Sequence, residues 1–153
     1  PGTARFERCA FDHAKLDGWR MSATELVGCR FVGPLRRMEF GGRPVVNAVQ
    51  RRERNEIRDN DFREADLHDV EFLGGVDLDA QLWPDDPTYL RLDVRPETLD
   101  RLARVVDRLP PEDRTPLADL AWVRGRFAGQ SEILVREGTW QWYRRLLRLA
   151  AGN

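Results

Sequence analysis

The first third of this chain places large apolar residues at every fifth position, a spacing that neither an α-helix nor a flat strand accommodates. The stretch ARFERCAFDHAKLDGWRMSATELVGCRF, residues 4–31, carries the first run. An α-helix repeats its buried face about every 3.6 residues and a strand every two, so neither keeps a period of five on one side. The pattern therefore requires a backbone that changes direction at regular intervals.

A second run with the same period follows at residues 55–72. Two places before the large residues stand mostly small ones, and most other positions are charged. Each unit therefore turns one small and one large side chain inward, as in solenoids whose units bury their faces by stacking. The predicted core consists of Phe6, Phe11, Leu16, Met21, Leu26, Phe31, Ile57, Phe62, Leu67 and Phe72.

One unit, Ala65-Asp66-Leu67-His68-Asp69, resembles the repeat of the pentapeptide-repeat proteins, Ala-(Asp/Asn)-Leu followed by two free positions. The resemblance implies a mainly β solenoid, a right-handed quadrilateral β-helix, over residues 1–83. Residues 41–54 show no period and are expected to form a loop inserted in this helix. Trp19, at a position for a small residue, departs from the pattern. Ordinary short strands in a sandwich remain the alternative.

From residue 84 to residue 153 the spacing becomes helical. Residues 96–109 place leucines and a valine three to four apart between two prolines, which predicts a helix. Residues 116–127 and a segment starting at Thr139 predict two more, whereas residues 131–138 fit either a strand or a helix. We expect a small α-helical C-terminal segment that covers one exposed end of the solenoid.

Composition excludes several classes of protein. The 153 residues carry a net charge of −1, which gives no bulk reason to expect direct nucleic-acid or membrane binding. No eighteen-residue apolar run and no signal-peptide pattern occur, and only two cysteines are present, so we expect a cytoplasmic protein. Cys9 and Cys29 occupy equivalent inward positions and are expected to be packed thiols, with a disulfide or metal pair as the alternative.

The residues that usually carry chemistry form no recognisable motif. His13 and His68 fall at outward positions without metal-ligand spacing around them, and Ser22 and Ser131 lie outside nucleophile motifs. No phosphate-binding glycine motif occurs either. We therefore predict that the chain is not an enzyme and has no catalytic, cofactor or metal site.

Charge placement is the remaining signal. Residues 55–79 carry nine acids against two arginines, whereas residues 36–54 carry six arginines against two acids. This basic segment and acidic stretch either bind a partner or pair with each other. The candidate partner-binding residues are Arg51, Arg52, Arg54, Asp59, Asp61, Glu64 and Asp66.

Three functions follow as hypotheses. The first is a non-catalytic protein–protein interaction scaffold with an unidentified protein partner. This hypothesis includes a homodimer formed through the C-terminal helices. The second is implied by the resemblance: a DNA mimic that binds DNA gyrase, as the quinolone-resistance pentapeptide proteins do. The third is an enzyme with a pocket in the helical segment, lined by Trp122, Trp140 and Tyr143.

Overall fold

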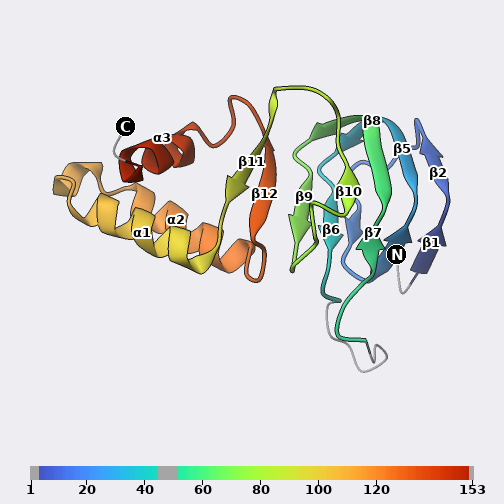
Figure 1. The fold of residues 1–153 in the computed structure, drawn as a ribbon, viewed down its shortest axis with the longest axis horizontal. Helices are drawn as coiled ribbons and strands as arrows, with labels where there is room; N and C mark the ends of the chain where they lie inside the picture. Colours follow the sequence, from blue (N-terminus) through green and yellow to red (C-terminus); the bar gives the residue numbers. More distant parts are fainter. Residues whose placement is uncertain (1–3, 45–51, 152–153) are drawn as a thin grey trace.

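The computed structural model describes residues 4–44 and 52–151, and its N-terminal part consists of three parallel sheets (Figure 1). One sheet joins β1 (Ala4–Glu7), β4 (Thr24–Val27) and β7 (Ile57–Arg58). The second joins β2 (Ala10–Asp12), β5 (Arg30–Arg36), β8 (Asn60–His68) and β10 (Gln81–Leu82). The third joins β3 (Arg20–Met21), β6 (Glu39–Gly41) and β9 (Glu71–Leu73). All three contribute to one hydrophobic core.

The register of these sheets stacks the large apolar residues on one another. Phe11 pairs with Phe31 across β2 and β5, and Phe40 with Phe72 across β6 and β9. The aromatic rings are stacked as well: the Phe31 ring lies 4.9 Å from that of Phe11 and 4.6 Å from that of Phe62. Trp83 continues this column beyond Phe62, at 5.2 Å. The column binds the successive parallel strands together through apolar contact.

The predicted fold class, a right-handed quadrilateral β-helix followed by an α-helical segment, is wrong. The strands form three separate parallel sheets and a fourth, antiparallel one, and none of the sheets in the described residues closes on itself. Strands β5 and β8, seven and nine residues long, run through positions where a corner every five residues was expected. Gly33 has φ +88° within β5, and the pairing of β5 with β8 continues on both sides of it. The period of five fixes side-chain spacing but not the number of sheets.

Buried amide side chains hydrogen-bond to the backbone inside the parallel sheets. Asn60 is fully buried; it accepts a hydrogen bond from the Cys29 backbone N–H (2.9 Å) and donates one to the Leu26 carbonyl (2.9 Å). Its amide also donates to Gln81 Oε1 (3.0 Å). Because buried polar groups are costly unless they are paired, these contacts fix the alignment of neighbouring strands.

The C-terminal part contains a two-stranded antiparallel sheet and helices that surround a second core (Figure 1). Its elements are β11 (Tyr89–Asp93), α1 (Pro96–Asp107), the 3₁₀ helix η1 (Pro111–Asp113), α2 (Pro116–Arg126), β12 (Glu132–Arg136) and α3 (Gln141–Ala150). The segment that the sequence left open is thus a strand, β12. None of these helices, nor any other in the described residues, is long and apolar enough to cross a membrane.

The antiparallel sheet lies between the parallel sheets and the helices. Alternate residues face opposite sides: Tyr89 and Leu134 pack against the first core, whereas Leu92 and Ile133 belong to the second. Tyr143 anchors α3 on this sheet, because its buried hydroxyl donates a hydrogen bond to the Asp93 carbonyl (2.6 Å). The C-terminal part is therefore not only helical, which is a second reason why the predicted fold class fails.

Asp93 joins the end of β11 to the start of α1, and this contact predicts an acid-sensitive contribution to stability. A salt bridge from Arg95 (2.6 Å) lowers the pKa of Asp93 to about 2, against its partial burial. The Arg95 backbone N–H and the Thr98 hydroxyl add hydrogen bonds of 2.9 and 2.8 Å. Because the folded-state pKa lies below the ordinary 3.8, the contribution is complete above that value and disappears as the pH falls towards 2.

We expect Asp93→Asn to lower the free energy of unfolding at neutral pH by on the order of 2 kcal/mol. The variant should also lose the part of the pH dependence that the wild type shows between about pH 4 and pH 2. Urea titrations at several pH values measure both effects, with Asp113→Asn in η1 as an exposed control. An unchanged slope with pH would contradict the assignment.

Candidate functional site

The candidate site lies where the C-terminal part covers the end of the parallel sheets. Polar side chains of the C-terminal part satisfy backbone groups there: the Tyr89 hydroxyl accepts a hydrogen bond from the Leu67 N–H (2.9 Å). The buried Gln130 accepts one from the Gly75 N–H (3.0 Å) and donates one to the Val76 carbonyl (2.6 Å). Side-chain hydrogen bonds thus supplement apolar packing at this junction.

A salt-bridge group reinforces the same junction. Arg126, the last residue of α2, bonds to Glu39 of β6 (2.8 Å) and to Glu71 of β9. The hydrogen bond to Glu71 and that to Glu39 together raise the pKa of Arg126 against its partial burial. Because α2 is joined in this way to two strands of one parallel sheet, the helix is fixed relative to that sheet.

Between the two parts is a cavity of about 220 Å³. Its walls come from the turn that joins β8 to β9, from β12 and from the residues just before α3. The lining is mixed: the aromatic members are Phe72, Tyr89, Phe127 and Trp140, and the polar ones are His68, Asp69, Glu71, Arg136 and Thr139. A mainly apolar hollow with a few polar groups is the usual form of a binding site.

A three-residue polar cluster stands at this cavity. His68 Nε2 lies 2.7 Å from Asp66, and Arg136 Nη1 lies 3.1 Å from the same carboxylate and 3.3 Å from His68 Nδ1. Partial burial opposes ionisation of Asp66, but the hydrogen bond from His68 and the charge of Arg136 leave its pKa below the ordinary value. Arg136 Nη1 also lies 3.2 Å from His68 Nε2, so the guanidinium contacts both ring nitrogens, and Asp66 contacts both His68 and Arg136.

From the cavity a group of aromatic rings extends to the outer surface of the helices. Trp140 lies 5.7 Å from Phe127, 5.8 Å from Trp122 and 6.0 Å from Trp142, measured between ring centroids. Trp122 is 53% exposed, although tryptophan is on average a largely buried residue. We call Trp122, Phe127, Trp140, Trp142 and Tyr143 the aromatic cluster. Phe127 and Tyr143 are buried within it, so its contact surface beside the cavity comes from the exposed Trp122 and the partly exposed Trp140 and Trp142.

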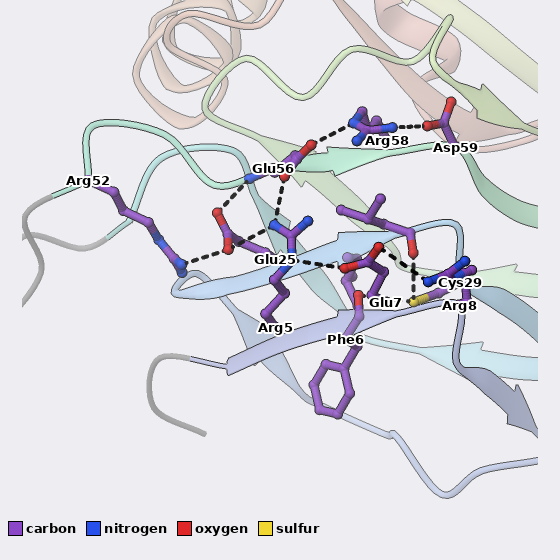
Figure 2. A network of polar contacts seen from close by, with 12 residues as sticks. Arg5, Phe6, Glu7, Arg8, Glu25, Cys29, Arg52, Glu56, Arg58 and Asp59 are labelled. Carbon is purple, nitrogen blue, oxygen red and sulfur yellow. Dashed lines mark hydrogen bonds and ion pairs between the residues drawn. The ribbon is translucent and has the colours of Figure 1, made fainter.

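The structure places Arg52, a candidate residue of the arginine-rich segment, against the sheet formed by β1, β4 and β7 (Figure 2). Arg52 pairs with Glu25 of β4 (3.1 Å) and donates to the Ala23 carbonyl (2.5 Å). Arg5 bridges Glu25 and Glu56, at 3.2 and 2.6 Å, and Arg58 pairs with Glu56 and with Asp59. Arg54 lies against Gly75. Arg51 is outside the described residues.

The predicted acidic residues are likewise paired within the chain. Asp61 pairs with Arg63 (2.8 Å), Glu64 with Arg30 across β8 and β5, and Asp66 with Arg136 and His68. Each of the four candidate acids, Asp59 included, therefore has an intramolecular cation. Of the candidate residues that the structure describes, only Asp66 lies beside the cavity, because its ion-pair partners His68 and Arg136 line it.

The ten predicted core residues all contribute to the first hydrophobic core. Phe6 and Phe11 are partly buried and pack against it, and the other eight are buried. Cys29 is buried, Cys9 is partly buried, and both are free thiols. Trp19 is 38% exposed, so its indole is not inserted among the core residues.

Two features of the site were not predicted from the sequence. His68 was expected to be a solvated surface residue, but it lies in the cluster at the cavity, whereas His13 is exposed. Asp66 and His68 are two residues apart in β8 and so point to the same side of the strand. This spacing was the sequence signal that could have predicted their contact. Arg136 comes from a distant strand, and nothing in the sequence linked it to these two residues.

Of the three pocket residues proposed in the helical segment, Trp140 lines the cavity, whereas Trp122 and Tyr143 do not.

No protein-family profile, no curated protein and no solved structure matches this chain. The resemblance to pentapeptide-repeat proteins therefore stays a prediction that rests on the repeat units alone.

Proposed function

We propose that this protein is a non-catalytic protein-binding module whose docking site is the cavity together with the aromatic cluster. The observation that carries the proposal is their continuity: Trp140 lines the cavity and lies 5.8 Å from the exposed Trp122. Tryptophan, tyrosine and arginine are the residues that contribute most to protein interfaces, and hot-spot residues are typically beside a pocket. A partner side chain in the cavity and a partner surface on the aromatic cluster would use both features.

The size of the cavity favours a protein partner over a cofactor. Pockets that enclose a whole small-molecule ligand usually have volumes of roughly 300–1,000 Å³. This cavity, at about 220 Å³, is smaller and suits one side chain of a docked segment.

The state of His68 favours binding over proton transfer. A general base must present a free nitrogen to the substrate, within hydrogen-bond reach. Asp66 lies beside Nε2 of His68, and Nη1 of Arg136 lies close to both ring nitrogens, 3.2 Å from Nε2 and 3.3 Å from Nδ1. The imidazole is thus held among charged neighbours of the same chain, which supports a binding role.

The pairing of surface charges favours this docking site over the charged segment considered from the sequence. A DNA mimic needs a continuous row of acids available to its target, but Asp59, Asp61, Glu64 and Asp66 are each paired with a cation of the same chain. A partner would have to break these pairs to use the acids. The aromatic cluster, by contrast, presents Trp122 without such a cost.

Selection from a displayed library of random linear peptides tests the proposal. We expect enriched peptides whose affinity, measured by fluorescence anisotropy, falls by about thirtyfold or more in Trp140→Ala, the loss expected of a hot-spot tryptophan. Val70→Phe, which fills the cavity from its wall, should weaken binding as well while leaving the aromatic cluster in place. Trp19→Ala, a partly exposed tryptophan outside the lining, is the control.

Two results would contradict the proposal. One is that the selection enriches no peptides although the wild-type protein melts cooperatively. The other is enrichment of peptides that bind Trp140→Ala and Val70→Phe as tightly as wild type. Light scattering of the unliganded protein adds a check, because a dimer that Trp140→Ala dissociates would identify the partner as a second copy.

A further inference from the structure

We infer that the group admitted to the cavity is a cation, namely the guanidinium or ammonium of an arginine or lysine side chain of the partner. This inference rests on the proposed function, because it specifies the chemistry of the same docking site. Two observations carry it: the aromatic composition of the cavity wall and an exposed carboxylate there that makes no ion pair with the residues the structure describes.

The aromatic wall suits a cation. Four aromatic residues line a cavity of about 220 Å³. The protein already places one cation on such a ring, since the guanidinium carbon of Arg136 lies 5.5 Å from the centroid of Tyr89. The faces of aromatic rings attract cations electrostatically within about 6 Å, and cages of such rings bind ammonium groups.

The charges around the cavity leave one carboxylate without a counter-ion. Asp69 lines the cavity and makes no ion pair within the part of the chain that the structure describes. Arg37, which is near enough to Asp69 to interact with it, is instead held by two hydrogen bonds to Asp17, of 2.9 and 2.6 Å. Asp69 can therefore pair with a cation that the partner supplies.

The net charge of the whole site is negative, like that of Asp69. The charged lining residues and their direct ion-pair partners comprise the acids Asp66, Asp69 and Glu71 and the bases Arg126 and Arg136. Three carboxylates against two guanidinium groups leave one negative charge while His68 is neutral. A cation brings this balance to zero, whereas an anion would increase the repulsion.

An anion would also have to displace contacts that are already made. The only lining group with a permanent positive charge is Arg136, and its Nη1 lies 3.1 Å from Asp66. An anionic ligand would compete with that carboxylate for Arg136. A cation at Asp69 leaves the pair of Arg136 and Asp66 intact.

Three small probes of similar size test the inference on the full chain: n-butylguanidinium, butyrate and 1-butanol. Amide chemical shifts of Val70 and Thr139, two lining residues, report occupation of the cavity. We expect n-butylguanidinium to bind at least about fivefold more tightly than the other two probes, as a cation–π contact with a facing carboxylate predicts. Asp69 is exposed, so Asp69→Asn should weaken n-butylguanidinium binding roughly 1.5- to fivefold and leave 1-butanol binding unchanged. Asp59→Asn, an exposed acid outside the cavity, is the matched control.

The outcomes separate this inference from the proposed function. Cation-selective shifts that depend on Asp69 support it. Three results would overturn the cation assignment while the cavity remained a docking site. They are 1-butanol binding as tightly as n-butylguanidinium, butyrate binding more tightly than n-butylguanidinium, and wild-type affinity for n-butylguanidinium in Asp69→Asn. Selected peptides that require Trp140 but contain no arginine or lysine would overturn it too, with the proposed function intact.

Discussion

Phe62→Ala is expected to lower the free energy of unfolding by about 3–5 kcal/mol, the usual cost of removing a fully buried phenylalanine. Phe62 is inaccessible to solvent, and its ring is stacked between Phe31 (4.6 Å) and Trp83 (5.2 Å). The rings of Phe40 and Phe72 contact it edge to face, each at 5.6 Å. Alanine leaves a cavity in the middle of the aromatic column, which the surrounding strands can fill only partly.

Urea unfolding followed by tryptophan fluorescence and by circular dichroism measures this loss. Phe6→Ala is the matched control, because Phe6 belongs to the same core but is only partly buried, and we expect about half the effect or less. Equal losses for the two variants would contradict the assignment of Phe62 to the centre of the column. A changed dependence on urea in Phe62→Ala would show instead that the variant alters the compactness of the denatured or native state, or that unfolding is no longer two-state.

The period of five located the core but not the architecture. Phe31 and Phe62 are thirty-one residues apart, and their rings nevertheless stack, because both occupy the large position of their units. The number of sheets depends on where the backbone bends, and a repeat of side-chain types does not specify that. Gly33 shows the limit: it has φ +88° within a strand that stays paired with β8, and nothing in the repeat distinguishes this glycine from a corner residue.

Even less of the candidate site than of the fold could be predicted from the sequence, because the residues of the site come from separate segments. Asp66 and His68 lie within one repeat unit, whereas Arg136 and Trp140 follow more than sixty residues later. The segment that contains Arg136 fits a strand or a helix by its sequence, and only its pairing with β11 makes it a strand. Tertiary contacts of this kind decide which charged residues meet, so the acidic stretch seen in the sequence says little about what is available at the surface.

Gln130→Leu is expected to lower the free energy of unfolding by about 3 kcal/mol, because it leaves two backbone groups without partners. Gln130 is buried and is the residue through which the segment before β12 bonds to the Gly75 N–H (3.0 Å) and the Val76 carbonyl (2.6 Å). Leucine is similar in size but can form neither bond. Urea unfolding measures the loss, and Gln141→Leu, an exposed glutamine at the start of α3, is the matched control.

Hydrogen exchange shows whether this loss arises at the junction itself. In wild type the Gly75 amide is bonded to a buried side chain, so we expect Gln130→Leu to accelerate exchange at Gly75 far more than at Asn60 in the centre of the parallel sheets. Because the cavity has one wall on each side of this junction, the variant should also weaken peptide binding although Gln130 is not in the lining. Slow exchange at Gly75 together with unchanged binding would mean that apolar packing alone holds the two parts together. The cavity would then not depend on the Gln130 hydrogen bonds.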